Sequence, residues 1–168
     1  MATVLRLDPR DKHHGYLLPM AVERIAATGE ELHDPDARRF AESIAAKLYV
    51  GDPSVCLLAI VEEETASLIG HVLGLAMMDG GRPVVMVSQR TLDKKAGDAL
   101  NQATEAAILW GLALKPKMLT VFDKTGKSDW KEIAKRFGLK PYRHLLWLPL
   151  NGNAHPAGGD SGDRGDRP

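Results

Sequence analysis

The sequence has few of the features that would cross-link or anchor a chain. Of its 168 residues only Cys56 is a cysteine, which excludes an internal disulfide and any zinc site made of several cysteines. Basic and acidic side chains number 22 each, so the overall charge gives no reason to expect nucleic acid or an anionic membrane as a partner. No apolar run approaches the ~20 residues of a spanning helix, and the N-terminus has no apolar signal-peptide core.

The chain does have enough apolar residues for one domain. Hydrophobic residues make up 44% of it, and a chain of this length buries roughly 68–70% of its unfolded surface without a metal or disulfide. We therefore expect a cytoplasmic protein with its domain in residues 1–150. Residues 151–168 consist mainly of Gly, Asp, Pro and Arg, which predicts a disordered C-terminal tail.

Hydrophobic periodicity predicts the order of the elements. Alternating or continuous apolar runs indicate strands, and apolar residues at three- and four-residue steps indicate helices. Gly29 and Gly138 are predicted to end two of the helices in a left-handed conformation, and Asp34 or Asp36 to cap another. Strands are expected at residues 3–7, 54–61, 67–78, 83–91, 117–122 and within 139–150, and helices at 19–28, 37–48, 98–114 and 129–137.

The connections predict how these strands pair. Short turns join residues 54–61, 67–78 and 83–91, so these three should form an antiparallel meander. A helix separates residues 83–91 from 117–122, which predicts a parallel pair. Both faces of the sheet look apolar, so helices should cover both. His71 interrupts an apolar strand and is expected in the core or a cleft wall, with a catalytic base as the less favoured alternative.

One segment, residues 91–99 (TLDKKAGDA), has a pattern suited to anion binding. It lies between a predicted strand and a predicted helix, where unpaired N–H groups carry the positive end of the helix dipole. Small residues at Ala96 and Gly97 let a phosphate approach the backbone, and two lysines precede them. The segment lacks the ending of a P-loop. An ordinary strand-to-helix turn with solvated lysines explains it equally well, and Asp98 would have to point away from a phosphate.

The element order and two motifs resemble the GNAT superfamily of N-acetyltransferases. The family's loop after the fourth strand reads Arg/Gln-x-x-Gly-x-Gly/Ala, which residues 94–99 (KKAGDA) fit with Lys in first place. Residues 134–143 (AKRFGLKPYR) look like the closing Tyr-x-x-x-Gly-Phe motif. The resemblance covers residues 3–150 and implies an α+β fold with a mixed, mostly antiparallel sheet, flanking helices and splayed central strands at 83–91 and 117–122.

The resemblance further implies acetyl-CoA as co-substrate, without a metal. Its pantetheine arm would lie between the splayed strands, and an amine would attack the thioester directly from the other side. The amine, a small molecule or a protein, would be chosen by the first two helices and the last strands. The implied cofactor contacts are Val87, Gln89, Thr91, Lys94 and the amides of Lys95, Ala96, Gly97, Asp98 and Ala99.

The chain departs from the family at the catalytic positions. The family's frequent tyrosine acid falls at Ala134, and residues 83–91 contain no carboxylate. The remaining candidates are Asp123, which follows a parallel strand, and Ser128 or Tyr142, either of which could protonate the leaving sulfur. The alternatives are an inactive GNAT-fold binding or assembly module and a ligand-binding domain that uses no acyl-CoA. The apolar residues 145–150 are compatible with a homodimer and equally with burial in the same chain.

Overall fold

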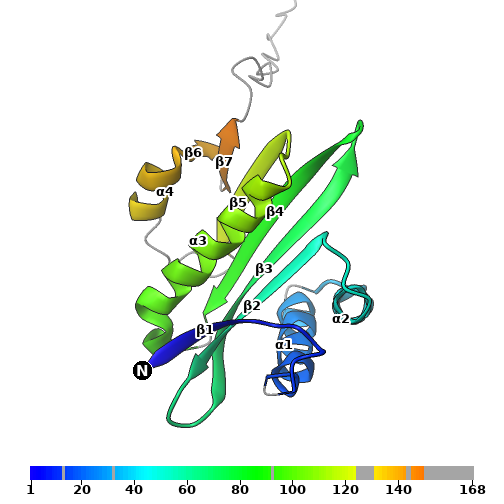
Figure 1. The fold of residues 1–168 in the computed structure, drawn as a ribbon, viewed down its shortest axis with the longest axis vertical. Coiled ribbons are helices and arrows are strands. Elements are labelled where there is room, and N and C mark those ends of the chain that lie inside the picture. Colours follow the sequence, from blue (N-terminus) through cyan, green and yellow to red (C-terminus); the bar gives the residue numbers. More distant parts are fainter. Residues whose placement is uncertain (13, 32, 92, 124–130, 143–144, 150–168) are drawn as a thin grey trace, which may run out of the picture.

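The computed structural model describes residues 1–12, 14–31, 33–91, 93–123, 131–142 and 145–149. Seven strands form one sheet in the order β1-β2-β3-β4-β5-β7-β6, with α1 and α2 on one face and α3 on the other (Figure 1). No helix in these ranges is long and apolar enough to cross a membrane. The strands are β1 (Ala2–Arg6), β2 (Val55–Glu62), β3 (Ser67–Asp79), β4 (Arg82–Thr91), β5 (Met118–Asp123), β6 (Lys140–Tyr142) and β7 (Leu145–Pro149). The helices are α1 (Leu17–Glu31), α2 (Ala37–Tyr49), the 3-10 turn η1 (Lys94–Ala96), α3 (Gly97–Ala113) and α4 (Lys131–Phe137).

The predicted α+β fold and antiparallel meander are confirmed. Strands β3 and β4 pair over ten residues in one unbroken register, from Gly70↔Thr91 to Asp79↔Arg82. Gly80 and Gly81 form the hairpin with φ values of +58° and +79°, a conformation that favours glycine. Strand β1 pairs antiparallel with β2 at one edge of the sheet, as expected.

The parallel pairing of β4 with β5 is confirmed, but the expected separation of these strands is absent along the pair. All six residues of β5 pair with β4, from Val84↔Met118 to Gln89↔Asp123. Beyond Gln89, the last β4 residue that pairs with β5, β4 continues through Arg90 and Thr91 without a β5 residue opposite them. Each β4 residue from 84 to 89 is therefore paired with β3 on one side and with β5 on the other.

Packing under α3 explains why these two strands stay together. Val85 and Val87 of β4 and Leu119 and Val121 of β5 are buried in one cluster with this helix. At Gly111 the helix comes so close that an added Cβ would lie 2.7 Å from a Val85 methyl and 2.9 Å from a Leu119 methyl. The helix thus covers both strands at once and favours their contact.

A glycine in α1 has a different role from the predicted one. The helix continues through Gly29 to Glu31 instead of ending there. An added Cβ at Gly29 would lie 2.4 Å from the Ala37 Cβ, so this glycine permits close packing of α1 on α2. The left-handed residue that follows α1 is His33, with φ of 57°. Asp36 takes the predicted N-cap position of α2 but makes no side-chain capping bond.

The C-terminal part contains two strands where one was expected. Strand β7 lies between β5 and β6, so both of its edges are paired within the chain. Gly138, with φ of +64°, ends α4 as predicted, and the Leu139 N–H donates to the Ala134 carbonyl at 2.9 Å. The predicted tail, residues 151–168, lies outside the described residues.

The close contact between β3 and α3 provides a test of this packing. A Cβ at Gly74 would lie 2.6 Å from Cζ3 of Trp110, so Gly74→Ala should destabilise the protein by about 1–3 kcal/mol. Urea unfolding measures the change. In a Trp110→Leu background, where the ring is gone, the same substitution should cost much less. An equal cost in both backgrounds would contradict the contact.

Candidate functional site

The loop from β4 to α3 contains the residues predicted to bind an anion, and Gly97 sets its backbone shape. Gly97 joins η1 to α3 with φ of 28° and ψ of −118°, a conformation that L side chains rarely adopt. Apart from its chain neighbours and the helix's own backbone, no atom lies within 4 Å of the position that a Cβ would occupy there. The Cβ side of Gly97, at the start of α3, is therefore open.

Two of the predicted phosphate-binding amides are already engaged within the loop. The Lys95 N–H donates to the Asp93 carboxylate at 2.9 Å, and the Ala96 N–H donates to the Asp93 carbonyl at 3.1 Å. Gly97, Asp98 and Ala99 lie in the first turn of α3, where an α-helix has no carbonyl partners for its N–H groups. These three amides are the ones best suited to an anion.

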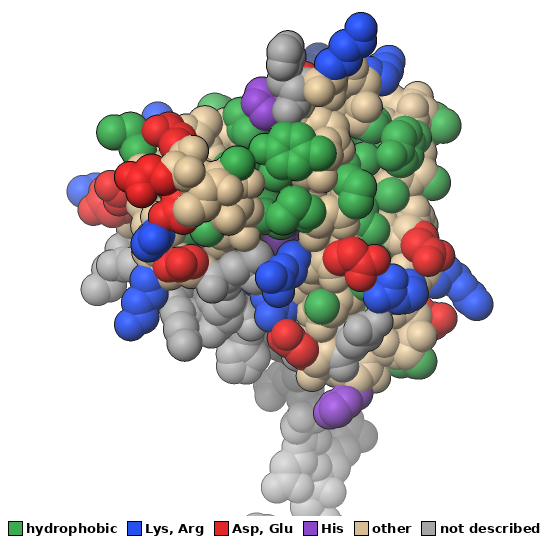
Figure 2. Space-filling view, turned by 90° about the horizontal axis from the view of Figure 1, so that it is seen from below, with side chains coloured by type: hydrophobic (Ala, Val, Ile, Leu, Met, Phe, Trp, Pro, Cys, Tyr) green, Lys and Arg blue, Asp and Glu red, His purple; other side chains and the backbone are tan. Residues whose placement is uncertain are grey.

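The charge around this loop is mixed. Lys95 Nζ lies 2.6 Å from Oε1 of Glu62 on β2. The bond from Lys95 lowers the pKa of Glu62, and the same bond raises the pKa of Lys95. Lys94 is exposed, and so are Asp93 and Asp98. Basic and acidic side chains intermingle on the face of the molecule that Figure 2 shows from below.

The strand contacts predicted for the cofactor arm differ from residue to residue. Val87 pairs with Gly74 of β3 and Val121 of β5, and Gln89 is likewise flanked on both sides. Thr91 pairs with β3, and β5 offers it no partner because β5 has ended. An arm that pairs with the β4 backbone would therefore fit at Thr91 as the strands stand, whereas contacts at Val87 and Gln89 need the β4–β5 pairs to open.

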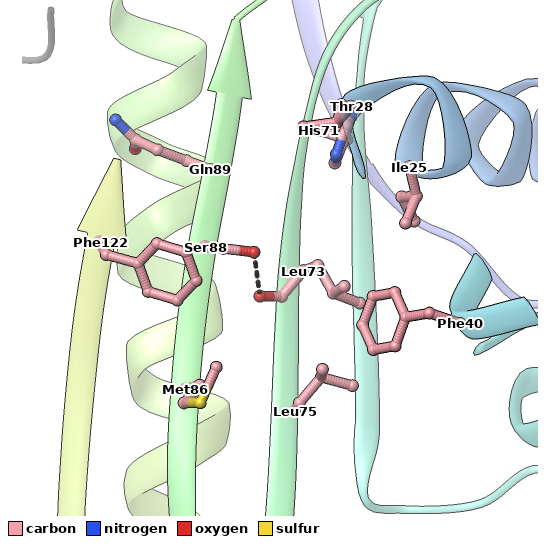
Figure 3. A pocket seen from close by; sticks show the side chains of 10 residues that line it. All are labelled: Ile25, Thr28, Phe40, His71, Leu73, Leu75, Met86, Ser88, Gln89 and Phe122. Carbon is pink, nitrogen blue, oxygen red and sulfur yellow. Dashed lines mark hydrogen bonds between the residues drawn. The ribbon is translucent and has the colours of Figure 1, made fainter. Parts of the chain in front are cut away.

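A cavity of about 100 Å³ lies on the opposite side of β4 from α3, beneath α1 and α2. Strand alternation puts the β3 side chains of His71, Leu73 and Leu75 and the β4 side chains of Met86 and Ser88 on this face (Figure 3). The Gln89 side chain instead points toward α3, where its Oε1 lies 2.7 Å from the Thr104 hydroxyl. The other described residues that line the cavity are Ile25, Thr28, Phe40 and Phe122.

The polar groups of the cavity gather toward the carboxyl end of β4. His71 is 5% exposed and stands directly opposite Arg90 in the β3–β4 register. The Arg90 guanidinium donates to the Thr28 hydroxyl and to Glu31 Oε2, the latter at 2.7 Å. Ser88 Oγ donates to the Leu73 carbonyl at 3.5 Å. One end of the cavity is therefore polar, and this end adjoins the loop that leads to α3.

The predicted catalytic residues are not gathered into one described cluster. Asp123 is the last residue of β5 and pairs with Gln89, next to the cavity residue Phe122. Tyr142 ends β6, which β7 separates from β5, so its backbone lies about three strand spacings, or roughly 14 Å, from β4. Ser128 lies outside the described residues.

Sequence reasoning missed most of the cavity. His71 was expected in the core or a cleft wall, and it is a buried wall residue. Phe40 lies in the helix predicted at residues 37–48 at a three-residue step from Ala37, which is typical of a buried stripe, yet it is 40% exposed and lines the cavity. The alternation of Met86 and Ser88 with buried Val85 and Val87 was the available signal that β4 has a second, more polar face.

Solved structures match this fold over nearly the whole chain, although no protein-family model and no curated protein sequence matches it. YncA of Salmonella typhimurium, solved with its cofactor acetyl-CoA, is similar with a TM-score of 0.59 and 13% identity over 94% of this chain and 99% of that one. A GNAT family acetyltransferase from Brucella melitensis in complex with acetyl-CoA has a TM-score of 0.52 and 16% identity over 90% of this chain and 89% of its own. A GNAT family acetyltransferase from Staphylococcus aureus covers 90% of this chain and 100% of its own, with a TM-score of 0.52 and 9% identity.

At 9–16% identity these likenesses establish the architecture. The chain has the fold of the GNAT acetyltransferases, in a divergent form.

Proposed function

We propose that this protein transfers an acetyl group from acetyl-CoA to an amine. The observation that carries the proposal is the meeting of two features at the carboxyl end of β4. The chain continues from the carboxyl end of β4 to Gly97, where α3 begins with its Cβ side open. The polar part of the cavity also lies at the carboxyl end of β4, on the sheet face that α1 and α2 cover. Within the GNAT fold this arrangement suits a cofactor on one side of the strand end and an acceptor on the other.

The chain offers specific groups for the cofactor. Lys94 and the amides of Gly97, Asp98 and Ala99 would hold the pyrophosphate, since the amides of Lys95 and Ala96 already bond to Asp93. The β4 backbone at Arg90 and Thr91 extends past the end of β5 and would pair with the pantetheine arm. Contacts farther back, at Val87 and Gln89, would follow only if the β4–β5 pairs open.

The acetyl-CoA thioester supplies an activated acyl carbon and a thiolate leaving group. The unprotonated acceptor amine attacks that carbon, the new C–N bond forms as the C–S bond breaks, and the amine loses one proton while the thiolate gains one. Asp123, at the end of β5 beside the cavity, is our proposed proton acceptor. Ser128 and Tyr142 remain the proposed proton donors to the leaving sulfur. A proton that neither of these side chains transfers would pass through water.

One observation favours a second function. The closed β4–β5 pairing leaves no gap between these strands along residues 84–89, and Val85 and Val87 fill the space beneath α3. A GNAT-fold module that binds or assembles without turnover would have no need for those strands to part. This candidate predicts that amines never cause release of free CoA.

Calorimetry with acetyl-CoA and a thiol-release assay separate these functions. We expect saturable heat from acetyl-CoA, and free thiol that appears only when acetyl-CoA and an acceptor amine are both present. Binding without thiol release across a broad amine panel would favour the module. No heat at all would contradict any CoA-dependent function.

The position of the cofactor is tested at Gly97. Gly97→Glu should reduce acetyl-CoA affinity at least a hundredfold, because a carboxylate would enter the space that an anionic group needs. Gly97→Ala is the matched control: it imposes the same backbone strain, about 1–3 kcal/mol, without the charge. Affinity should therefore survive in the alanine variant. If both variants bind equally well, the pyrophosphate does not lie at this loop.

A further inference from the structure

The cavity beneath α1 and α2 has an apolar end that the proposed chemistry does not use. Away from the carboxyl end of β4, its wall consists of Leu75 on β3 and Met86 on β4, with Phe40 of α2 facing them (Figure 3). These side chains carry no group that could neutralise a charge. An apolar group placed there would gain from burial, whereas a charged group would lose its hydration without compensation.

The size of the cavity limits what it can hold. A sealed apolar cavity of about 150 Å³ takes up benzene. This cavity has about 100 Å³, or roughly two-thirds of that volume. By this comparison it accommodates an aliphatic group of about four carbons.

The direction of such a group follows from the position of the reacting centre. The polar end, with His71 and Ser88, adjoins the strand end where the proposed function puts the thioester. The amine nitrogen of an acceptor must lie at this end. Its substituent then extends along β4 from Ser88 toward Met86, into the apolar end.

Charge at the polar end also constrains the acceptor. The Arg90 guanidinium is bound to Thr28 and Glu31 next to His71, and none of the described lining residues is a carboxylate. With its first nitrogen at the polar end, a diamine would place its second ammonium among the apolar side chains at the other end, where no described lining residue could neutralise it. This arrangement disfavours diamines and polyamines.

We infer that the acceptor is a primary amine with one short, uncharged aliphatic substituent, which the cavity selects through its apolar end. This inference rests on the proposed acetyl transfer and names its substrate class. Two features define this class. The amine lies at the polar end of the cavity, near His71 and Ser88, and about four carbons lie among Leu75, Met86 and Phe40.

A homologous series of amines tests the inference with the intact protein. From ethylamine to butylamine, kcat/KM for acetyl transfer should rise about fourfold per methylene, the value expected for burying one CH₂. Beyond butylamine, with pentylamine and hexylamine, the increase should stop. Putrescine, which has the four carbons of butylamine and a second ammonium, should react at least a hundredfold more slowly. Equal rates along the series, or a preference for putrescine, would overturn the inference while leaving acetyl transfer established.

Two variants locate the effect in the cavity. Phe40→Ala should lower the gain per methylene to less than twofold, because it removes the wall opposite Leu75. Leu109→Ala is the matched control, since Leu109 is an exposed apolar residue on α3, on the other face of the sheet. The control should keep the full chain-length dependence. If Phe40→Ala also keeps it, the substituent does not occupy this cavity.

A binding measurement keeps the test independent of turnover. Titration with N-butylacetamide, the neutral product expected from butylamine, should shift the methyl NMR signal of Met86 and leave that of Met78, which is 71% exposed on β3, unchanged. Absence of thiol release with every amine would overturn the proposed function. In that case the Met86 shift alone decides whether the cavity takes a short aliphatic amide, and no shift would overturn the ligand class.

Discussion

The double pairing of β4 is the constraint on which the rest of the structure depends. With β3 on one side and β5 on the other, β4 cannot slip by one residue without exchanging its two faces. In the observed register Val85 and Val87 enter the core under α3, and Met86 and Ser88 face α1 and α2. The core beneath α3 and the cavity on the other face therefore result from the same alternation.

This constraint also links the strand interior to the loop beyond it. Helix α3 begins at Gly97, beside the proposed pyrophosphate site. Near its other end, Gly111 packs closely on Val85 of β4 and Leu119 of β5. A movement of α3 at its first turn would therefore change the packing over both β4 and β5. Any opening of these strands would require the buried contacts under the helix to rearrange. An anion at the proposed pyrophosphate site would therefore act on the helix that also covers the β4–β5 pair.

Local patterns allowed most of the fold to be predicted, and features that depend on contacts between distant segments were not predictable. The stripe on α2, the Gly80-Gly81 hairpin and the crossover through α3 each lie within a short stretch of sequence. Gly29 allows α1 to pack closely on Ala37 of α2. Because this contact is not visible in the local sequence, Gly29 was predicted to end the helix. The loop at residues 94–99 was recognisable as a strand-to-helix turn, but its capping by Asp93 was not. The cavity is lined by five elements between Ile25 and Phe122, and no local motif encodes such a set.

The burial of the single thiol has a practical consequence. Cys56 lies in β2 with 2% of its surface exposed, and burial raises its pKa. The thiolate is the form that reacts with electrophiles, so this side chain should be inert toward thiol-specific dyes while the protein stays folded. A colour reaction that follows coenzyme A would consequently start from a low background, and a cysteine introduced on the surface could carry a fluorophore or spin label as the sole reactive site.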